Sequence, residues 1–488
     1  MATTPGPQRL PSASEKGGMP PGPPGSMVAR HPCANWRRRP FLPLLILLLA
    51  VAFLILRPSI RGNDGVQNYA FLRSLLFDGD LDFSNDYAYY QSRHAEWFDY
   101  KEIPRDPVTG RPINLYGIGN AVLWAPWVLA AHALGHLANG LGASFALDGY
   151  SRLYETAVGA GSCFHASAGI LVIFTLLRRR YGDARAFWAC LTVWLASPLL
   201  FYMYFHPSMS HANSFFLASV LLALYLGGDS YRRWGAMGFV AGLLVLTRFQ
   251  DAVLLATPVV GELFRLRDSL ARGTGVVAAV CSRLPRYSLF ATVALLVFSP
   301  QFLVWKALQG SAFSGPRAYM MQGSLRPWAP IHLADALFSP FHGLFHWHPL
   351  LLLAAAGLFV ARTRSRRLRL MALAAFAAQS WVIGSWSIWW AGASFGHRMF
   401  ISTLPFLAVG MAAVIRRTGW RARAARLAIV FFILWNFGLL VQYGLPMIPR
   451  QAPVPLTAIA RNNLVELPRM MIQKVIGRQE TKSTNGRE

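Results

Sequence analysis

The sequence has few charged residues and few cysteines for its length. Only 14% of its 488 residues are charged, whereas 54% are hydrophobic and the mean hydropathy is +0.35. Soluble domains carry about 25% charged residues, so this composition excludes a soluble multidomain protein and indicates a polytopic membrane protein. The four cysteines have neither the spacing of a metal site nor that of a disulfide framework, and we expect buried apolar side chains at Cys33, Cys163, Cys190 and Cys281.

Acidic residues are also scarce, since 21 Asp and Glu stand against 47 Lys and Arg. The arginines gather in short clusters at the ends of apolar runs, where cytoplasmic loops of membrane proteins carry them. Membrane topology therefore explains the formal charge of +26 better than a nucleic-acid partner does. The sequence has no GxxxxGK[ST] motif, so it shows no phosphate-binding loop for a nucleotide.

Three regions differ in composition. Residues 1–38, rich in Pro, Gly and Ser, are expected to form a disordered cytoplasmic tail. Residues 39–445 hold the apolar runs and form the membrane domain, whose first run, 41–56, has no A-x-A cleavage site and is expected to be retained as a helix. Residues 446–488 form a polar, basic tail, expected outside the cytoplasm, to which the sequence assigns no function.

The arginine clusters predict the topology of an all-α polytopic membrane protein. RRRP before residue 41 places the N-terminus inside, and Arg178–Arg180 should also lie inside. Together with the span at 153–177, this leaves residues 58–152 as a large first extracytoplasmic loop. About eleven membrane helices follow from hydrophobic length, with spans at 41–56, 153–177, 186–205, 212–227, 234–247, 252–264, 287–306, 343–361, 370–390, 399–415 and 427–445.

The apolar run 117–142 has two interpretations. As an interfacial helix it would lie on the outer leaflet within the large loop. As a membrane span it would place RRRYGDAR outside, against the distribution of positive charge. We expect the interfacial helix.

Five aspartates lie between residues 62 and 86, just after the first span. Asp64 precedes a helical pattern of apolar residues, so it is either a catalytic carboxylate at the membrane surface or the N-cap of that helix. The other four, in FDGDLDFSNDY, lack the remaining ligands of a calcium-binding EF-hand loop. We expect these four to form turns: Asp78, Asp80, Asp82 and Asp86.

Two arginines occupy unusual positions. Arg248 lies between two short apolar segments, where a charge commonly marks a functional site; it could pair with Asp251 three residues later or bind a phosphate through its fork of donors. Arg398 ends the stretch WWAGASFGHR, in which Trp389 and Trp390 precede small residues that would let a ligand approach the backbone at Gly392 and Gly396.

The histidines form no recognised zinc motif, and we expect hydrogen-bonded interfacial side chains rather than metal ligands. This expectation applies to His206, His211, His342, His346 and His348.

Taken together, these pieces resemble the integral-membrane C-type glycosyltransferases, in the branch of the protein O-mannosyltransferases and the lipid A aminoarabinose transferase-like bacterial proteins. The resemblance rests on the order of NDGVQNYAFLRSLL with DGDLDFSNDY, NLYGIGNAVLWAPWVLAAH, GLLVLTRFQD, FSPFHGLF and WWAGASFGHR, spread over residues 41–445. One departure is that HPSMSH, with His206 and His211, stands where family members often carry a second acidic residue after the third span.

The resemblance implies an inverting glycosyltransferase of the cytoplasmic (inner) membrane, with a polyprenyl-phosphate sugar donor and an extracytoplasmic active site. Asp64 would be the general base. The donor phosphate would be held by Arg248 and Arg398, with Arg317 a further candidate, and His206, His211 or His397 could assist. No cofactor or divalent metal is expected, and the sugar and the acceptor (a glycan, a lipid or a protein) stay open.

Two other classes stay open beside the transferase. A lipid or solute transporter or flippase would also need many spans and buried charge, although the sequence shows no internal repeat of the kind that many transporters have. A scaffold with the transferase fold and no activity is the third class, because a fold does not establish a function.

Overall fold

The computed structural model describes residues 40–94, 98, 103–316, 323–359, 366–415 and 419–473. All of them belong to the second of two units into which the chain divides, Met1–Arg39 and Pro40–Glu488. In this described part the regular structure is helical, apart from two isolated β-bridges, Arg105 with Pro112 and Leu325 with Trp386.

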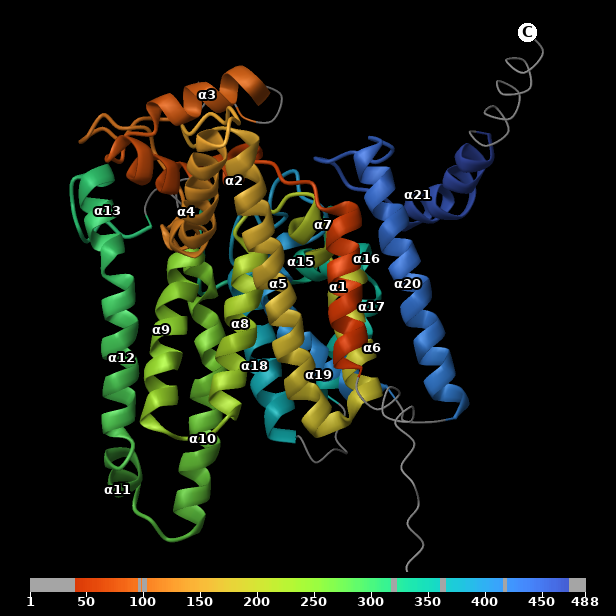
Figure 1. Cartoon of the computed structure of the whole chain (residues 1–488). Coiled ribbons are helices and arrows are strands. Elements are labelled where there is room, and N and C mark those ends of the chain that lie inside the picture. Colours follow the sequence, from red (N-terminus) through yellow and green to blue (C-terminus); the bar gives the residue numbers. More distant parts are fainter. Residues whose placement is uncertain are drawn as a thin grey trace, which may run out of the picture. The chain divides into compact units, whose positions relative to one another are not determined.

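The long helices of this unit run side by side as a bundle (Figure 1). Their bounds are α1 Phe41–Ile55, α5 Arg152–Tyr181, α6 Asp183–Leu195, α8 His211–Leu226, α9 Tyr231–Thr247, α10 Ala256–Ala271, α12 Leu284–Phe298, α17 Leu350–Phe359, α18 Arg366–Gly384, α19 Leu404–Val414 and α20 Trp420–Gly444.

The remaining elements lie mostly at the two ends of the bundle. These are α2 Gly62–Arg73, the π-helix η2 Ser74–Asp78, α3 Ser84–His94, α4 Gly119–Gly140, α7 Leu199–Tyr204, the 3₁₀-helix η4 Phe249–Leu255, α11 Val276–Cys281, α13 Pro300–Gln309, α15 Leu333–Phe338, α16 Leu344–Trp347, the 3₁₀-helix η5 Arg398–Thr403, α21 Leu456–Arg461 and the π-helix η6 Asn462–Glu466.

Four helical stretches in the described residues are long and apolar enough to cross a membrane: Gly119–Gly140, Arg152–Tyr181, Leu284–Gln309 and Trp420–Gly444. Shorter apolar helices include Phe41–Ile55, His211–Leu226, Leu350–Phe359 and Arg398–Val414. Each span expected from hydropathy contains a helix, so the helical fold class is confirmed. The number of about eleven crossings stays a prediction.

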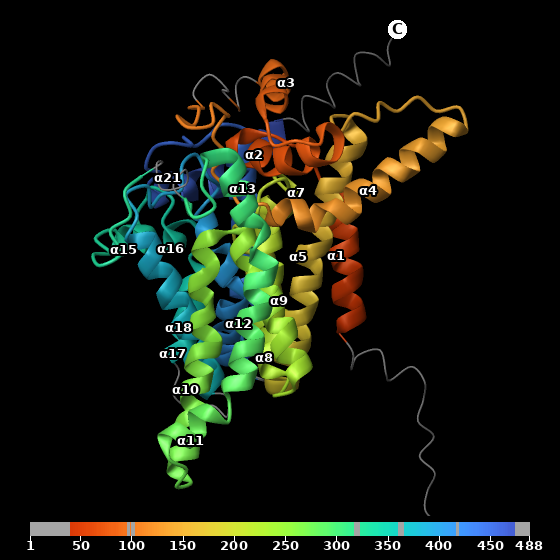
Figure 2. The same cartoon turned by 90° about the vertical axis from the view of Figure 1, so that its left-hand side faces the viewer.

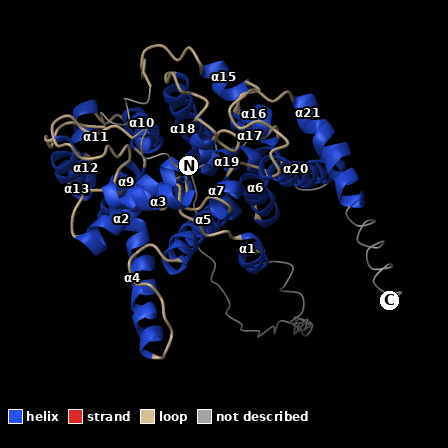
Figure 3. Cartoon of the chain, turned by 90° about the horizontal axis from the view of Figure 1, so that it is seen from above, coloured by secondary structure: helices blue, strands red, loops and turns tan. Residues whose placement is uncertain are grey.

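Helix α4 covers the run whose course the sequence left open. Figures 2 and 3 show that it extends sideways from the bundle, across the direction that α5 and α12 follow. Its length and composition would also suit a span. The sideways course favours the interfacial interpretation, because a spanning helix would follow its neighbours.

The large first loop has a hydrophobic core of its own, formed by aromatic and aliphatic side chains of α2, α3, α4 and the start of α5. The Tyr69 hydroxyl donates to the carbonyl of Gly149 at 2.7 Å, and the Trp124 indole donates to the Ser162 hydroxyl at 2.8 Å. Buried aromatic side chains contribute large apolar areas, and their polar atoms usually find a hydrogen-bond partner. The described part of the loop is therefore packed as a platform on the bundle.

A row of buried amides fastens this platform to the bundle. Asn120 of α4 donates to Asn68 of α2 at 2.7 Å and accepts from Asn213 of α8 at 2.9 Å. Asn213 also contacts the ring of His165 on α5 at 2.8 Å. Asn68 in turn donates to the backbone carbonyl of Asp64 at 2.6 Å. Because buried amides are costly to leave unpaired, this row fixes the first turn of α2.

Asp80 and Asp82 form turns, as expected, and Asp78 ends η2. The prediction is wrong for Asp86, which is buried in the first turn of α3. Asp80 accepts from the Ser74 hydroxyl at 2.7 Å and the Asp82 amide at 3.0 Å, and Asp82 accepts from the Ser84 amide at 3.1 Å. Asp78 pairs with Arg73. The partners of these carboxylates therefore all belong to the same loop.

The expectation for the cysteines is wrong at one position. Cys163 and Cys190 are buried, but Cys281 is exposed because it ends the short helix α11 beyond the bundle. Cys33 lies outside the described residues.

Candidate functional site

A cavity of about 750 Å³ lies beside the first turn of α2. This volume is in the range of small-molecule sites in proteins. Segments far apart in the sequence line it: Arg61–Asp64, Tyr116, Phe201 to Met209 in part, Arg248, Trp386 to Met399 in part, Leu440 to Gly444 in part, and Arg450 with Gln451.

Charge in the cavity is strongly unequal. Four arginines line it, Arg61, Arg248, Arg398 and Arg450, and among the described lining residues Asp64 supplies the one carboxylate. Guanidinium groups concentrated in a partly enclosed space attract anions, and their planar forks suit phosphate in particular. The described lining of the cavity therefore carries a net positive charge, with a single carboxylate among four guanidinium groups.

Asp64 pairs with Arg398, with 2.9 Å between the carboxylate oxygen and the guanidinium nitrogen. Both side chains keep 19% of their surface exposed, so water and a ligand can reach them. Arg61, not Asp64, is the N-cap residue of α2, and no side chain caps this helix end. The N-cap interpretation of Asp64 is therefore wrong.

Arg248 occupies the break that the sequence indicated between two short helices. It has extended backbone angles (φ −152°, ψ 110°) between α9 and η4. Its guanidinium donates to the Ser210 hydroxyl at 3.0 Å and lies 3.7 Å from the buried Asp251 carboxylate. The two interpretations of Arg248 are thus compatible, because the arginine pairs with Asp251 and also lines the cavity.

Asp251 holds Arg248 in place from within the protein. This fully buried carboxylate accepts from Ser402 at 2.9 Å and from Ser214. Hydrogen bonds from several donors stabilise a buried carboxylate, so Asp251 does not depend on Arg248 alone. The guanidinium of Arg248 can therefore also face the cavity.

Two lining arginines were missed by the sequence reasoning. Arg61 donates to the Phe205 carbonyl at 2.9 Å, and its own carbonyl accepts from the His206 ring at 2.8 Å. Arg450 follows α20, and its guanidinium lies 4.8 Å from the centre of the Tyr443 ring. Arg61 lies three residues before Asp64 in the sequence, so the sequence could have indicated it as a candidate site residue. Arg450 lies in the polar tail and carries no local signal.

The three candidate histidines differ in position. His206 lines the cavity, and burial lowers its pKa to about 4, so the ring is neutral at pH 7. His211 is buried behind Arg248, at 3.1 Å from the guanidinium. His397 is buried against the Phe400 ring, with 4.7 Å between centroids, and lies outside the cavity lining. An assisting role at the cavity surface is therefore open to His206 alone of these three.

The stretch WWAGASFGHR contributes its small residues and its arginine to the cavity. Ala391 and Gly392 have left-handed backbone angles (φ 63° and 69°), and a Cβ at Gly392 would meet open space. The tryptophans face elsewhere, since Trp390 stacks on Phe341 at 5.5 Å between centroids. Gly396 packs on His348 instead of lining the cavity.

Arg317, the remaining phosphate candidate, lies outside the described residues. In the described ranges, no three side chains of the types His, Cys, Asp and Glu come together as a possible metal site. His342 and His346 contact backbone carbonyls instead, those of Trp390 at 3.1 Å and Val454 at 2.8 Å.

Comparisons with known proteins give structural neighbours but no sequence relatives. No protein-family model matches the chain, and no curated protein matches it. The chain is similar to a crystal structure of ArnT from Cupriavidus metallidurans bound to undecaprenyl phosphate, with 16% identity and a TM-score of 0.48, over 87% of this chain and 74% of that one. The apo crystal structure of the same ArnT matches with 15% identity and a TM-score of 0.49, over 88% and 75%.

Proposed function

We propose that this chain is a membrane glycosyltransferase that moves a sugar from a polyprenyl-phosphate donor to an acceptor at the outer face of the cytoplasmic membrane. One observation carries the proposal: four arginines and one carboxylate, from segments far apart in the sequence, line a single cavity at the end of a bundle of apolar helices. Phosphate binding needs the arginines, and proton removal from an acceptor needs the carboxylate.

The convergence of the sequence motifs supports the same proposal. Asp64, Tyr116, Arg248 and Arg398 belong to four of the five pieces on which the family resemblance rests, and all four line the cavity. The fifth piece, FSPFHGLF, lies outside the lining. Motifs that meet at one cavity are expected of a shared reaction site, because packing alone would not direct their polar residues to the same space.

The proposed reaction is a single displacement. The acceptor hydroxyl oxygen attacks the anomeric carbon of the sugar, and the bond from that carbon to the phosphate oxygen breaks. Asp64 takes the hydroxyl proton, and the electron pair of the broken bond leaves with polyprenyl phosphate. Attack opposite to the leaving group inverts the anomeric centre. Arg248 and Arg398 stabilise the negative charge on the departing phosphate.

Arg398 has two partners in this scheme. In the structure it pairs with Asp64. A donor phosphate in the cavity would share the guanidinium, which has donors in a fork and can bind two anions at once. The same arginine would then hold the base and the leaving group in a fixed relation, and orientation of this kind contributes strongly to catalysis.

The proposal is tested by transfer of labelled sugar from a panel of polyprenyl-phosphate sugars to a membrane extract by the purified protein. We expect one donor to support transfer, with release of polyprenyl phosphate. A well-folded protein that binds none of the donors and transfers none of the sugars would contradict the proposal. A lipid-translocation assay in vesicles would then test the transporter class.

A further inference from the structure

A second cavity, of about 820 Å³, lies among helix ends remote from the first. Figure 1 shows α2 at one end of the bundle, and the last turns of α5 and α10 at the other. Helix α5 has 30 residues, which corresponds to about 45 Å at 1.5 Å per residue. Six arginines from three helices line this second cavity: Arg179, Arg180, Arg265, Arg267, Arg366 and Arg367.

No carboxylate lines this second cavity in the described part of the chain. Two of the six arginines form ion pairs with carboxylates that do not line the cavity. Arg367 pairs with Asp268 at 2.5 and 2.7 Å, and Arg265 pairs with Asp229 at 3.3 Å and with Glu262 at 3.2 Å. For the other four, the described residues provide no ion pair.

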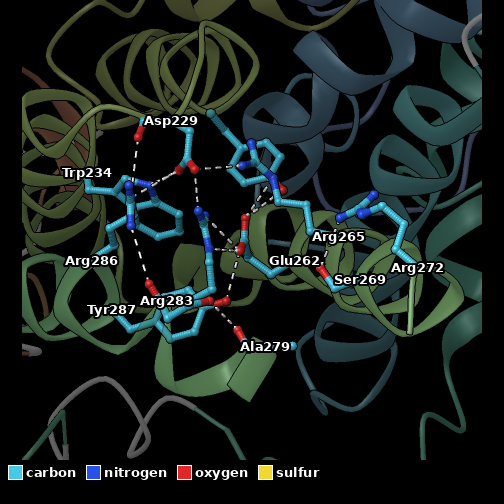
Figure 4. Close-up of polar contacts among 12 residues, drawn as sticks. Asp229, Trp234, Glu262, Arg265, Ser269, Arg272, Ala279, Arg283, Arg286 and Tyr287 are labelled. Carbon is cyan, nitrogen blue, oxygen red and sulfur yellow. Dashed lines mark hydrogen bonds and ion pairs between the residues drawn. The ribbon is translucent and has the colours of Figure 1, made fainter. Parts of the chain in front are cut away.

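In a neighbouring cluster, the arginines form ion pairs with carboxylates (Figure 4). Arg283 lies 3.0 Å from Glu262, and Arg286 lies 3.5 Å from Asp229. These ion pairs tie α9, α10 and α12 together, and their cations already face carboxylates. The cluster therefore has a structural role, and Arg265 belongs both to it and to the cavity lining. The described residues give no such carboxylate partner to Arg179, Arg180, Arg267 and Arg366.

The rest of the second cavity is largely apolar. Leu226 of α8, Phe264 of α10 and Leu368 with Met371 of α18 contribute to its walls. A cavity lined by both cations and apolar side chains suits an amphiphilic anion. Basic pockets between membrane helices bind the head groups of anionic lipids for this reason.

We propose that the second cavity binds the phosphate of an anionic membrane phospholipid, with acyl chains beside Phe264 and Leu368. The lining arginines that have no ion pair in the described residues come from α5, α10 and α18, which are far apart in the sequence: Arg179, Arg180, Arg267 and Arg366. A bound phosphate would hold these arginines together against their mutual repulsion. This inference is independent of the proposed transferase activity, because it concerns another cavity.

The test measures lipid retention by the full chain. The purified protein is incubated with phosphatidylglycerol or with phosphatidylcholine in detergent, and bound lipid is counted by native mass spectrometry. We expect retention of phosphatidylglycerol over phosphatidylcholine. The double variant Arg179→Gln/Arg366→Gln should lose affinity for phosphatidylglycerol by roughly tenfold or more, since each basic side chain near an anionic lipid contributes substantially.

A control variant with the same change in net charge distinguishes the loss of cavity arginines from a general loss of positive charge. Arg232→Gln/Arg421→Gln removes two exposed arginines outside the cavity lining and should leave retention unchanged. Equal loss in both double variants, or no loss in the cavity variant, would overturn the proposal. If the cavity variant does not fold, a competition experiment on the wild type decides the assignment, with inorganic phosphate added to the protein that holds phosphatidylglycerol. Displacement of the lipid by phosphate at equal concentration would overturn the lipid assignment in favour of free phosphate.

Discussion

The Asp64 carboxylate and the Arg398 guanidinium lie 2.9 Å apart, although they come from α2 and from η5, far apart in the sequence. Three further arginines line the same cavity: Arg61, Arg248 and Arg450. A carboxylate among arginines can act on a neutral acceptor while the remaining cations hold an anion. The predictions below follow from this arrangement and from the contacts that maintain it.

Arg248→Ala should weaken binding of a polyprenyl-phosphate donor by about 2–3 kcal/mol, in the range of a lost charged hydrogen-bond partner. Because Asp251 would keep its bonds to Ser402 and Ser214, the protein should still fold. Donor affinity is measured by thermophoresis with the lipid in detergent. Arg248→Lys keeps the charge without the fork and should give an intermediate affinity; full affinity in the alanine variant would exclude Arg248 from the phosphate site.

Asn120→Ala should lower both stability and turnover. The substitution leaves the buried amides of Asn68 and Asn213 short of a partner, which costs about 1–3 kcal/mol. Because Asn68 also bonds the Asp64 backbone, the first turn of α2 should lose its fixed position. Thermal unfolding and sugar transfer are compared at a temperature where both proteins are folded. Unchanged turnover per folded molecule would show that the amide row has no part in positioning Asp64.

Asp86 should make the first loop less stable at high pH. Burial raises the pKa of this carboxyl from 3.8 to about 7, and Arg73 opposes the rise only in part. Stability from the neutral form is present below the unfolded pKa and is lost as pH rises through the folded pKa, so the melting temperature should fall between about pH 4 and about pH 7.

Asp86→Asn tests this origin of the pH dependence. The asparagine stays neutral and can still accept the Tyr150 hydroxyl, which lies 3.2 Å from the carboxylate. Its melting temperature should therefore fall less with pH than that of the wild type, while the exposed Asp335→Asn should keep the wild-type slope. Parallel slopes for wild type and Asp86→Asn would contradict the assignment.

The contact between α17 and α19 depends on two glycines. A Cβ at Gly410 would press on the carbonyl of Ala354, and one at Gly357 on the carbonyl of Gly410 itself. Close approach at small residues is typical of membrane helices. Gly410→Ala should therefore destabilise the protein by about 1–3 kcal/mol. Gly140→Ala, where a Cβ meets open space, is the control, and equal melting temperatures for the two variants would contradict the prediction.

Hydropathy and charge were sufficient to predict the helices of the bundle, the long loop between α1 and α5 and the break at Arg248. These features depend on local sequence, because an apolar run of sufficient length becomes a helix wherever it packs. The course of α4 was harder to predict, since its composition suits both a span and an interfacial helix. Its sideways course depends on contacts with α2 and α5, which no local pattern encodes.

The candidate site was predicted only in part for a similar reason. Asp64, Arg248 and Arg398 stand out locally as charges beside apolar runs, and all three line the cavity. Arg450 reaches it only because the chain after α20 turns back toward the first loop, and His397 misses it because its side chain points into the interior. Side-chain direction and the return of a tail depend on tertiary packing.

The most direct measurement compares turnover and donor affinity of the wild type with those of Asp64→Asn, once a sugar donor has been found. The account predicts that turnover falls by about 10²–10⁴-fold, the usual contribution of a general base, whereas donor affinity is kept or improved because the arginines remain and a negative charge is removed. The exposed Asp335→Asn should match the wild type in both. Wild-type turnover in a folded Asp64→Asn protein would contradict the account.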